Sequence, residues 1–290
     1  MHRAFIALVA ITFLTYPAIL SAKSVRIGYL ETYTPWLVGI ADGKFERATA
    51  HKITWTKFES GTDIINALAR DEIDIGSAGS APIAAALSLD HQIELFWILQ
   101  DINFAEGLVI RKGSNIVAPQ DLRGRRIAVP FASTTHYHMI FALQQFRIGV
   151  EEVKLTYLKP KEIEAAWSDG RIDATFIWNP LLDRLLRTGT IMINSGRLSR
   201  WGKQTFDGLV ADKRWAAQNP DFMVDFIKTI SDIDTEIKEK PELWSRNSVN
   251  VAKISQFLGG TPFSTVKSLR LYSRPSIKNA GDQSMAWWRE

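Results

Sequence analysis

Short apolar runs alternate with segments of helical spacing through the first 110 residues of the 290-residue chain. Residues 53–58 (ITWTKF) alternate apolar and polar side chains, which is typical of a half-buried strand. Patterns of this kind predict strands at residues 25–29, 53–58, 73–75, 94–99 and 107–111, helices at 36–41, 63–69 and 83–89, and a small-residue loop at 76–82. This order indicates βαβ units and a mostly parallel sheet.

The pattern then restarts. Residues 125–129 (RRIAV) resemble residues 25–29 (VRIGY), and a strand, a polar loop and a helix are expected after each start. Residues 67–75 and 166–174 both carry an Ile-Asp pair before their last residue, and both lead through a loop to a proline and a helix. An internal repeat of this kind predicts two similar α/β lobes.

The last third of the chain is mainly helical after one more strand, expected at residues 205–211. From residue 220, apolar side chains recur at spacings of three and four, which predicts a helix with a broad apolar face. Gly259 and Gly260 separate a further helix, expected at residues 262–271, and the tail from residue 273 has no clear periodicity.

Residues 127–143 carry the first candidate chemistry, because a buried strand, a hydroxyl-rich loop and a helix follow one another there. This layout directs free backbone N–H groups and the positive end of a helix dipole at one place, which suits an anion. Ser133, Thr134 and Thr135 are equally good N-cap residues, so helix capping is the alternative. Both interpretations stay open on this stretch alone.

Two lobes that face each other would bring several such loops to one cleft. Ligands of open α/β sheets bind beyond the carboxyl ends of the strands. The loops expected there are 31–35, 79–82, 131–136 and 178–180, with 59–61 nearby. They contain few cations, so an anionic group would be held by helix dipoles and hydrogen bonds.

Composition narrows the class of protein. The net charge is only +4, and the basic residues are scattered, which argues against a nucleic-acid partner.

Residues 1–22 have a short basic start, an apolar run and the small residues Ser21 and Ala22, so they are expected to be a secretory signal peptide; a retained membrane anchor is the alternative. The chain has no cysteine, which excludes disulfides, thiolate catalysis and cysteine-based zinc sites. A soluble periplasmic protein fits these features.

Enzyme motifs are absent from the sequence. No nucleophile elbow, phosphate-binding loop, zinc-protease helix or dinucleotide fingerprint occurs. His136 and His138 are two residues apart, so on a helix they face different ways and cannot share a metal. A carboxylate pair for acid–base work remains open, since acidic residues lie near several expected strand ends: Glu31, Glu59, Glu106 and Asp207. For each of them a solvated or helix-capping carboxylate is the alternative.

Five motifs resemble the taurine-binding branch of the periplasmic solute-binding proteins of sulfonate/nitrate/taurine ABC importers. They are residues 57–61 (KFESG), 75–83 (IGSAGSAPI), 126–137 (RIAVPFASTTHY), 165–167 (AAW) and 201–207 (WGKQTFD). The resemblance runs from about residue 25 to 271 and implies an α/β type II periplasmic-binding-protein fold, with two lobes joined by a two-strand crossover hinge near residues 107–111 and 206–210. It implies lobe 1 at residues 23–108 plus 209–290 and lobe 2 at 109–208.

The resemblance also implies a ligand site. A sulfonate is expected against one set of loop residues from each lobe, an ammonium against carboxylates, and the short aliphatic part between aromatic walls. The sulfonate is expected against Gly79, Ser80 and Ala81 of one lobe and Thr134, Thr135 and His136 of the other. The ammonium is expected against Asp207 and Glu106. The aliphatic part is expected between Trp178 and Tyr33, with Glu59 nearby. Protonation of His136 would strengthen the anion site.

The function that follows from the resemblance is capture of taurine or a related small aminosulfonate for an inner-membrane ABC permease and its ATPase. The chain is expected to be a periplasmic monomer, with no cofactor, no metal and no catalytic role. The alternatives are the same fold binding an alkanesulfonate or a thiamine-precursor pyrimidine, or an enzyme of that fold. Such proteins normally continue with a closing helix past the position of Tyr272, whereas residues 273–290 are short and polar.

Overall fold

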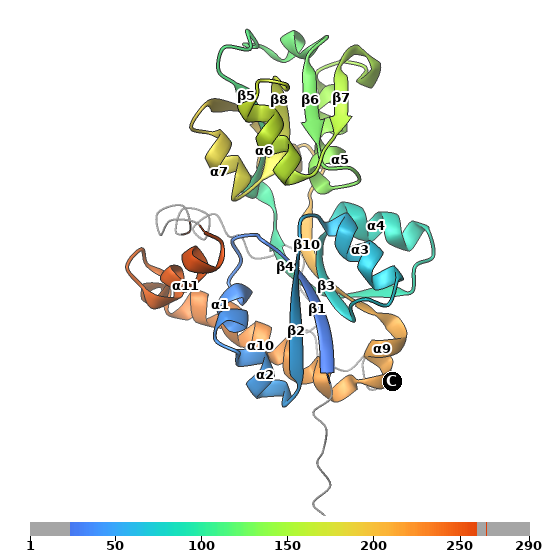
Figure 1. Ribbon diagram of the computed structural model, residues 1–290, viewed down its shortest axis with the longest axis vertical. Coiled ribbons are helices and arrows are strands. Elements are labelled where there is room, and N and C mark those ends of the chain that lie inside the picture. Colours follow the sequence, from blue (N-terminus) through green and yellow to red (C-terminus); the bar gives the residue numbers. More distant parts are fainter. Residues whose placement is uncertain (1–23, 260–264, 266–290) are drawn as a thin grey trace, which may run out of the picture.

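The computed structural model describes residues 24–259 and Thr265. The expected signal peptide, the helix at 262–271 and the tail from 273 therefore lie outside the described residues. Two α/β lobes stand one above the other in Figure 1, and each is built around a five-stranded sheet. No helix among the described residues is long and apolar enough to cross a membrane.

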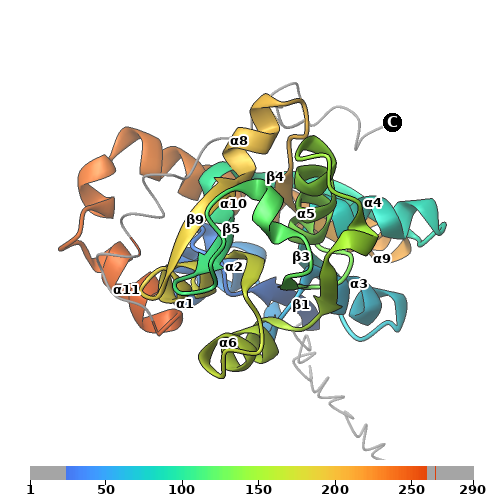
Figure 2. The same cartoon turned by 90° about the horizontal axis from the view of Figure 1, so that it is seen from above.

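The lower lobe contains the sheet with strand order β2-β1-β3-β10-β4. Seen from above, α11 lies to one side of this lobe and α3 and α4 lie to the other (Figure 2). Its strands are β1 (Ser24–Leu30), β2 (Lys52–Phe58), β3 (Ile75–Gly79), β4 (Ile93–Asp101) and β10 (Phe206–Asp212). Its helices are α1 (Trp36–Ala41), α2 (Lys44–Thr49), α3 (Gly61–Ala69), α4 (Ser80–Ser88), α9 (Lys213–Gln218), α10 (Pro220–Glu239) and α11 (Val249–Phe257), with the short η4 (Pro241–Trp244).

The upper lobe repeats this arrangement with strand order β7-β6-β8-β5-β9. Its strands are β5 (Glu106–Arg111), β6 (Arg126–Val129), β7 (Lys154–Tyr157), β8 (Ala174–Trp178) and β9 (Gly189–Asn194). Its helices are α5 (Thr134–Gln145), α6 (Pro160–Ser168), α7 (Leu181–Leu185) and α8 (Ser195–Arg200), with the short turns η1 (Asn103–Ala105), η2 (Pro119–Leu122) and η3 (Val150–Glu152). The two-lobe α/β prediction is confirmed.

The sheets are mixed, so the prediction of a mostly parallel sheet is wrong in one strand of each lobe. In the lower sheet β10 runs antiparallel to both β3 and β4, and in the upper sheet β5 runs antiparallel to β8 and β9. Each of these strands is the one that arrives from the other lobe. It therefore enters its sheet at the end that faces the other lobe and runs antiparallel to its neighbours.

The chain crosses between the lobes between β4 and β5 and again between α8 and β10. The two connecting segments lie together, because the backbone N–H of Ile102 donates to the carbonyl of Thr205 at 3.1 Å. The crossings were expected near residues 107–111 and 206–210, and they lie directly before these residues, which belong to β5 and β10. A second local difference is that residues 76–79, expected as a loop, complete β3.

An ion pair at the same place in both lobes explains the sequence repeat. The guanidinium and the backbone N–H of Arg26 donate to Asp74, with distances of 2.5–3.2 Å. In the upper lobe Arg126 makes the same three contacts with Asp173 at 2.6–3.0 Å. Hydrogen bonds from Arg126 lower the pKa of Asp173 to about 2. The repeated Ile-Asp pair therefore ties the segment before β3 or β8 to β1 or β6.

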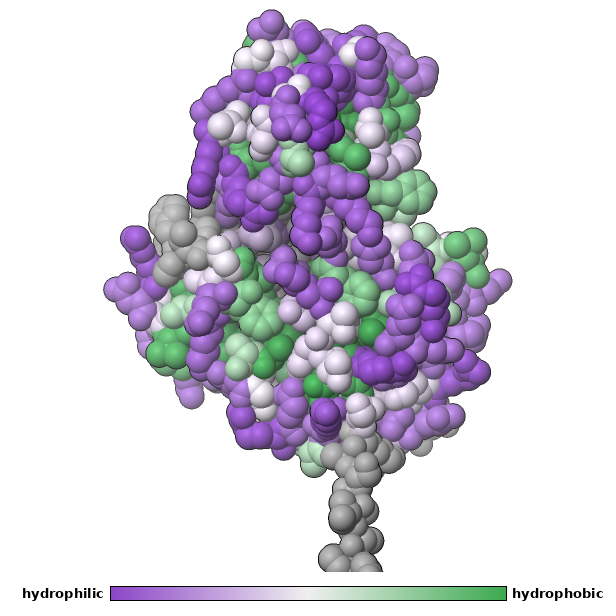
Figure 3. Space-filling model, viewed as in Figure 1, coloured by the Kyte–Doolittle hydropathy of each residue, from purple (hydrophilic) through white to green (hydrophobic). Residues whose placement is uncertain are grey.

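Apolar side chains fill both faces of each sheet. The largest core of the lower lobe surrounds Trp36, Phe45 and Phe226, which are at most 1% exposed. Hydrophilic residues cover most of the surface on the face seen in Figure 3. Each lobe thus has two apolar clusters that pack against its sheet.

Candidate functional site

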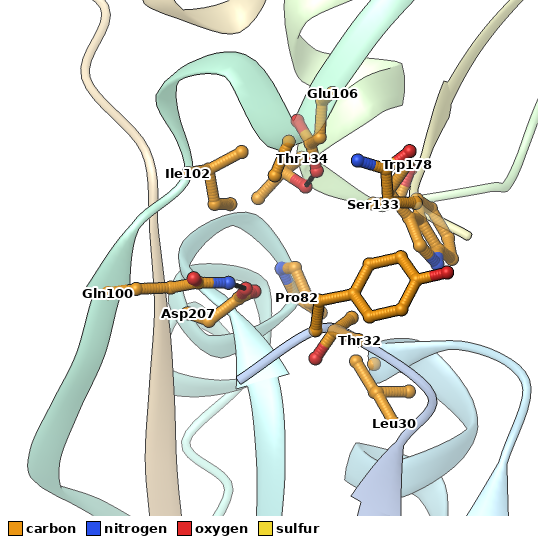
Figure 4. Close-up of a pocket in the computed structure, with 15 residues that line it drawn as sticks. Leu30, Thr32, Pro82, Gln100, Ile102, Glu106, Ser133, Thr134, Trp178 and Asp207 are labelled. Carbon is orange, nitrogen blue, oxygen red and sulfur yellow. Dashed lines mark hydrogen bonds between the residues drawn. The ribbon is translucent and has the colours of Figure 1, made fainter. Parts of the chain in front are cut away.

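A small cavity lies between the lobes, where strand ends and helix starts from both sheets converge. Its volume is about 40 Å³, measured as the space open to the centres of water molecules. On this measure one water needs about 10–15 Å³, so the cavity suits a few waters or one small solute. It is lined by Leu30, Thr32, Tyr33, Gly61, Gly79, Pro82, Gln100, Ile102, Ala105, Glu106, Ser133, Thr134, Trp178, Asn179 and Asp207 (Figure 4).

Three helices begin at this cavity. Gly61 is the first residue of α3, Gly79 immediately precedes α4, and Thr134 is the first residue of α5. Ser60 and Ser133 cap α3 and α5 through their side chains, whereas α4 has no side-chain cap. Each helix start leaves backbone N–H groups without a partner in the helix, and the three dipoles add positive potential. This part of the cavity suits an anionic group.

Two carboxyl groups face the same cavity, one buried (Glu106) and one partly buried (Asp207). Asp207 comes from β10, and its Oδ2 accepts a hydrogen bond from the Gln100 amide at 2.8 Å. Glu106 comes from β5, and its two oxygens lie within hydrogen-bond distance of the hydroxyls of Thr134 and Ser195, the latter at 3.0 Å. Figure 4 shows Gln100 and Asp207 on one side of the cavity and Ser133 and Trp178 on the other.

Burial changes the acidity of both groups. It raises the pKa of Asp207 to about 6, against the opposing effect of the Gln100 hydrogen bond. It raises the pKa of Glu106 to about 8, with a further increase from the charge of Asp207 and with opposing effects of the Thr134 and Ser195 hydrogen bonds. At neutral pH Asp207 is therefore mostly an anion and Glu106 mostly a neutral acid. A cationic group placed between them would lower both pKa values.

Apolar and aromatic side chains form the rest of the wall. Tyr33 lies in the segment between β1 and α1, and Trp178 is the last residue of β8. Leu30, Pro82, Ile102 and Ala105 add to the apolar lining. These groups fit a short aliphatic segment and leave its polar ends to the helix starts and the carboxyls.

The lobes also touch outside the cavity. The α3 start of the lower lobe meets the α5 and α6 starts of the upper lobe through two ion pairs and one hydrogen bond. The contacts join Asp63 to Lys159 at 2.9 Å, Glu59 to Lys161 at 2.7 Å, and the hydroxyl of Thr62 to the carbonyl of Phe131 at 3.1 Å. A Cβ added at Gly79 would lie only 2.7 Å from Cγ2 of Thr134. The lobes are therefore closed around the cavity.

The residues expected at the site from the sequence fall into two groups. Those that line the cavity are Tyr33, Gly79, Glu106, Thr134, Trp178 and Asp207. Those that lie beside it are Glu59, Ser80, Ala81, Thr135 and His136. Glu59 forms the ion pair with Lys161 between the lobes. The Ser80 hydroxyl accepts a hydrogen bond from the backbone N–H of Phe206 at 3.3 Å, and the Thr135 hydroxyl lies 2.8 Å from that of Ser133.

His136 does not supply a cation to the cavity. Its Nδ1 accepts a hydrogen bond from the backbone N–H of Ala132 at 3.2 Å, and its ring packs against Phe131 and Tyr157. Burial lowers the pKa of His136, which favours the neutral ring at pH 7. The positive potential at the cavity thus comes from the helix starts rather than from this histidine.

The structure adds site residues that the sequence did not single out. Gln100 holds Asp207, and Thr32, Asn179 and Ile102 also line the cavity. Gln100 follows directly after the expected strand 94–99, so the rule that ligands bind beyond strand ends could have found it. No local pattern marks Ile102, because its place depends on the crossing between the lobes.

Comparison with known proteins supports one family. The family described as NMT1/THI5 like matches residues 36–242. The taurine-binding periplasmic protein of Escherichia coli K12 is 34% identical over 262 residues, which cover 90% of this chain and 80% of that protein. This chain belongs to the NMT1/THI5-like family. A putative aliphatic sulfonates-binding protein of the same organism is 25% identical, over 85% of this chain and 79% of that protein.

Solved structures confirm the fold of this family member. The alkanesulfonate-binding protein SsuA from Xanthomonas axonopodis pv. citri, bound to MOPS, has a TM-score of 0.79 at 21% identity, covering 93% of this chain and 91% of that chain. The desulfurization enzyme DSZB has a TM-score of 0.61 at 15% identity, covering 92% of this chain and 90% of that chain. Binding proteins and an enzyme thus share this fold, so function must be argued from the site.

Proposed function

We propose that this protein is a periplasmic solute-binding protein that captures taurine or a related small aminosulfonate for an ABC importer. The observation that carries the proposal is the cavity's combination of three helix starts with the two carboxyls of Glu106 and Asp207. A zwitterion with an anionic and a cationic end fits both features. The names of the relatives, one taurine-binding and others aliphatic sulfonates-binding, support the same ligand class.

In this proposal the sulfonate lies against the starts of α3, α4 and α5, and the ammonium lies between Asp207 and Glu106. Trp178 and Tyr33 cover the two methylene groups. Single helix ends contribute about 0.3–2 kcal/mol each, whereas a micromolar Kd needs about −8 kcal/mol. Both charged ends must therefore be paired and shielded from water, which the closed lobes provide.

The size of the ligand sets an upper bound on affinity. Taurine has about seven heavy atoms, so at a ceiling of about −1.5 kcal/mol per atom its binding energy could reach about −10 kcal/mol. An alkanesulfonate without an amine would leave Asp207 as a buried anion without a cation, which costs binding energy. The carboxyls are therefore the feature that selects an aminosulfonate over a plain sulfonate.

The chain is proposed to act without catalysis and to deliver its ligand to an inner-membrane permease with its ATPase. Within the described residues no group of three or more histidine, cysteine or acidic side chains could hold a metal ion. The periplasmic location is proposed from the names of the relatives and from the character of residues 1–22.

Isothermal titration calorimetry with taurine, ethanesulfonate and sulfate tests the proposal. We expect taurine to bind with a micromolar or lower Kd and ethanesulfonate to bind at least tenfold more weakly. Tighter binding of ethanesulfonate than of taurine would contradict the role of the carboxyls and favour an alkanesulfonate-binding protein.

A further inference from the structure

A chain of buried hydrogen bonds leads from Glu106 away from the cavity. The hydroxyl of Ser195 lies 3.0 Å from Oε2 of Glu106 and 2.7 Å from Nδ1 of His138. On its far side, Nε2 of His138 lies 2.8 Å from the carbonyl oxygen of Lys203. Ser195 and His138 are 0% exposed and Glu106 is 3% exposed. No sequence motif points to Ser195, and for His138 the spacing only excludes a metal shared with His136.

Counting donors and acceptors restricts where the protons of this chain are. The carbonyl of Lys203 can only accept, so Nε2 of His138 must carry a proton. The Ser195 hydroxyl has one proton and can give it either to Glu106 or to His138. If it donates to His138, then Glu106 must be the neutral acid that donates to Ser195. If it donates to Glu106, then Nδ1 must also be protonated and His138 is an imidazolium.

Both arrangements contain the same number of protons and the same net charge. A third arrangement, with an ionised Glu106 and a neutral His138, would place the lone pair of Nδ1 against a Ser195 oxygen that has no proton for it. Such a contact at 2.7 Å leaves a buried acceptor without a donor, which is costly. The chain therefore holds one proton that belongs to either Glu106 or His138.

Without a ligand the proton belongs to Glu106. Burial raises the pKa of Glu106 to about 8, and burial lowers the pKa of His138. The charged group that faces Glu106 from β10 is Asp207, which favours the neutral acid. The rings of Tyr137 and Phe176 pack against His138 and add no charge next to it.

We propose that Ser195 and His138 form a proton relay that lets Glu106 become a carboxylate when an ammonium group enters the cavity. Oε2 of Glu106 gives its proton to the Ser195 oxygen, and Ser195 gives its own proton to Nδ1 of His138. The cavity gains a negative charge while the protein neither takes up nor releases a proton. His138 and Ser195 are thus positioning residues that set amine preference, and this inference rests on the proposed function.

The relay is distinct from the serine–histidine–acid arrangement of hydrolases, although it contains the same residue types. The Ser195 hydroxyl is fully buried and does not line the cavity, so it cannot reach a substrate. The acidic member Glu106, rather than the serine, faces the ligand. Proton storage, not nucleophilic attack, is the chemistry that this order of residues permits.

Nitrogen-15 NMR of the histidine rings tests the relay on the unaltered protein. In the ligand-free state at pH 7 we expect His138 as the neutral tautomer with the proton on Nε2. On saturation with taurine we expect its two ring nitrogens to move to the values of an imidazolium, whereas saturation with ethanesulfonate should leave them unchanged. An imidazolium or an Nδ1–H tautomer without ligand, or a neutral ring with taurine bound, overturns the relay.

A variant provides a second measurement. His138→Gln keeps a donor for the Lys203 carbonyl but cannot accept the relayed proton, so Glu106 must lose its proton to solvent when an amine binds. Between pH 6 and 8, where an alkylammonium stays charged, we expect the ratio of the variant's taurine Kd to that of the unaltered protein to fall about tenfold per pH unit. Taking the ratio cancels the titration of Asp207.

His91→Gln is the matched control, because His91 directly follows the turn after α4 and is not among the residues that line the cavity. It should keep the pH profile of the unaltered protein. Identical profiles for His138→Gln and His91→Gln overturn the relay. Failure of taurine to bind the unaltered protein would instead reject the proposed function, and the tautomer of His138 in the ligand-free protein would still test the hydrogen-bond order of the chain.

Discussion

Glu106 and Asp207 occupy matching places in the two lobes but have different partners. Each lies at the start of the strand that arrives from the other lobe, and each such strand is fourth in its sheet order. Asp207 is held by the amide of Gln100, which donates one hydrogen bond whatever the pH. Glu106 is held by hydroxyls that can donate or accept. An amide partner favours the anion, whereas hydroxyl partners tolerate both charge states.

This difference shows how one buried site can hold two carboxyls without two permanent charges. Two unpaired carboxylates in a closed cavity would repel each other and would both be poorly solvated. With one anion and one neutral acid, the ligand-free site carries a single charge at pH 7. In the ion pairs Arg26–Asp74 and Arg126–Asp173, by contrast, a cation accompanies each carboxylate, so both carboxylates can stay charged.

The largest effect expected to distinguish the two carboxyls is on the pH dependence of the free energy of unfolding. Both groups have a folded-state pKa above the unfolded value, so the stability they contribute is full below about pH 4 and is lost as pH rises through the folded pKa. Between pH 5 and 8 the loss is about 3–4 kcal/mol for Glu106 and about 1 kcal/mol for Asp207, from pKa values of about 8 and about 6.

Urea unfolding of the ligand-free protein at pH 5, 6.5 and 8 measures this difference. Glu106→Gln should remove most of the pH dependence, and Asp207→Asn should remove a smaller part that is confined to lower pH. Titrating groups outside the site cancel when each variant is compared with the unaltered protein, whereas Asp207→Asn also lowers the pKa of Glu106, because it removes the charge of Asp207. Equal changes in the two variants would show that the two carboxyls have the same folded-state pKa.

The next largest effect is on ligand selectivity. Asp207→Asn should weaken taurine binding by about 100-fold or more, because it removes the carboxylate that is already ionised at pH 7. Glu106→Gln should weaken it by only about tenfold, since the acid starts neutral and Gln resembles it. Calorimetry with taurine and ethanesulfonate distinguishes the two, and ethanesulfonate affinity should stay the same or rise in Asp207→Asn. A greater loss in Glu106→Gln would reverse the assignment of charges.

The sequence could predict the parts of this site that have a local signature. The hydroxyls before α5 are good cap residues after a short apolar strand, and Asp207 opens an apolar run, so both lie at predicted strand or helix ends. The assignment of these residues to a sulfonate and an amine came from family resemblance, not from local pattern. Ser195 and His138 are 57 residues apart, and only the packing of α8 against α5 brings them together. Their relation to Glu106 therefore has no sequence signal.

The fold was predictable to a similar extent. The alternation of strands and helices and the repeated Ile-Asp pair were enough to predict two α/β lobes. Strands β7 and β9 were missed, although β2 and β4, which also lie at sheet edges, were predicted. β7 has only four residues, none of them buried, so its apolar pattern is weak. The reversed direction of β5 and β10 was missed because hydrophobic periodicity does not depend on the direction of a neighbouring strand.

A smaller effect is expected where the lobes meet between the two carboxyls. Gly79 has an ordinary backbone φ of −72°, so alanine fits the isolated lobe without strain. In the closed state its Cβ would lie 2.7 Å from Thr134 and 3.7 Å from an oxygen of Asp207. Because the added methyl group overpacks this contact, Gly79→Ala should oppose closure of the lobes. It should weaken the binding of taurine and of ethanesulfonate equally, by about tenfold.

This variant separates shape from charge in the comparison of the carboxyls. Titration of both ligands provides the measurement, and urea unfolding of the ligand-free protein is the control, which should change little. If only taurine binding were weakened, the added methyl group would be acting on Asp207 rather than on closure.

The smallest effect is expected at the solvent-exposed ion pairs that join the lobes outside the cavity. The ammonium of Lys159 contacts Asp63 at 2.9 Å across the lobes, and the Lys159 side chain is 57% exposed. Exposed ion pairs contribute little, so Lys159→Met should weaken taurine and ethanesulfonate binding by only about two- to threefold. Repeating the titrations at 0.5 M salt should remove most of that difference, because screening acts on exposed charges. A loss comparable to that of Asp207→Asn, or one that persists at high salt, would mean that closure depends on these ion pairs rather than on the two carboxyls.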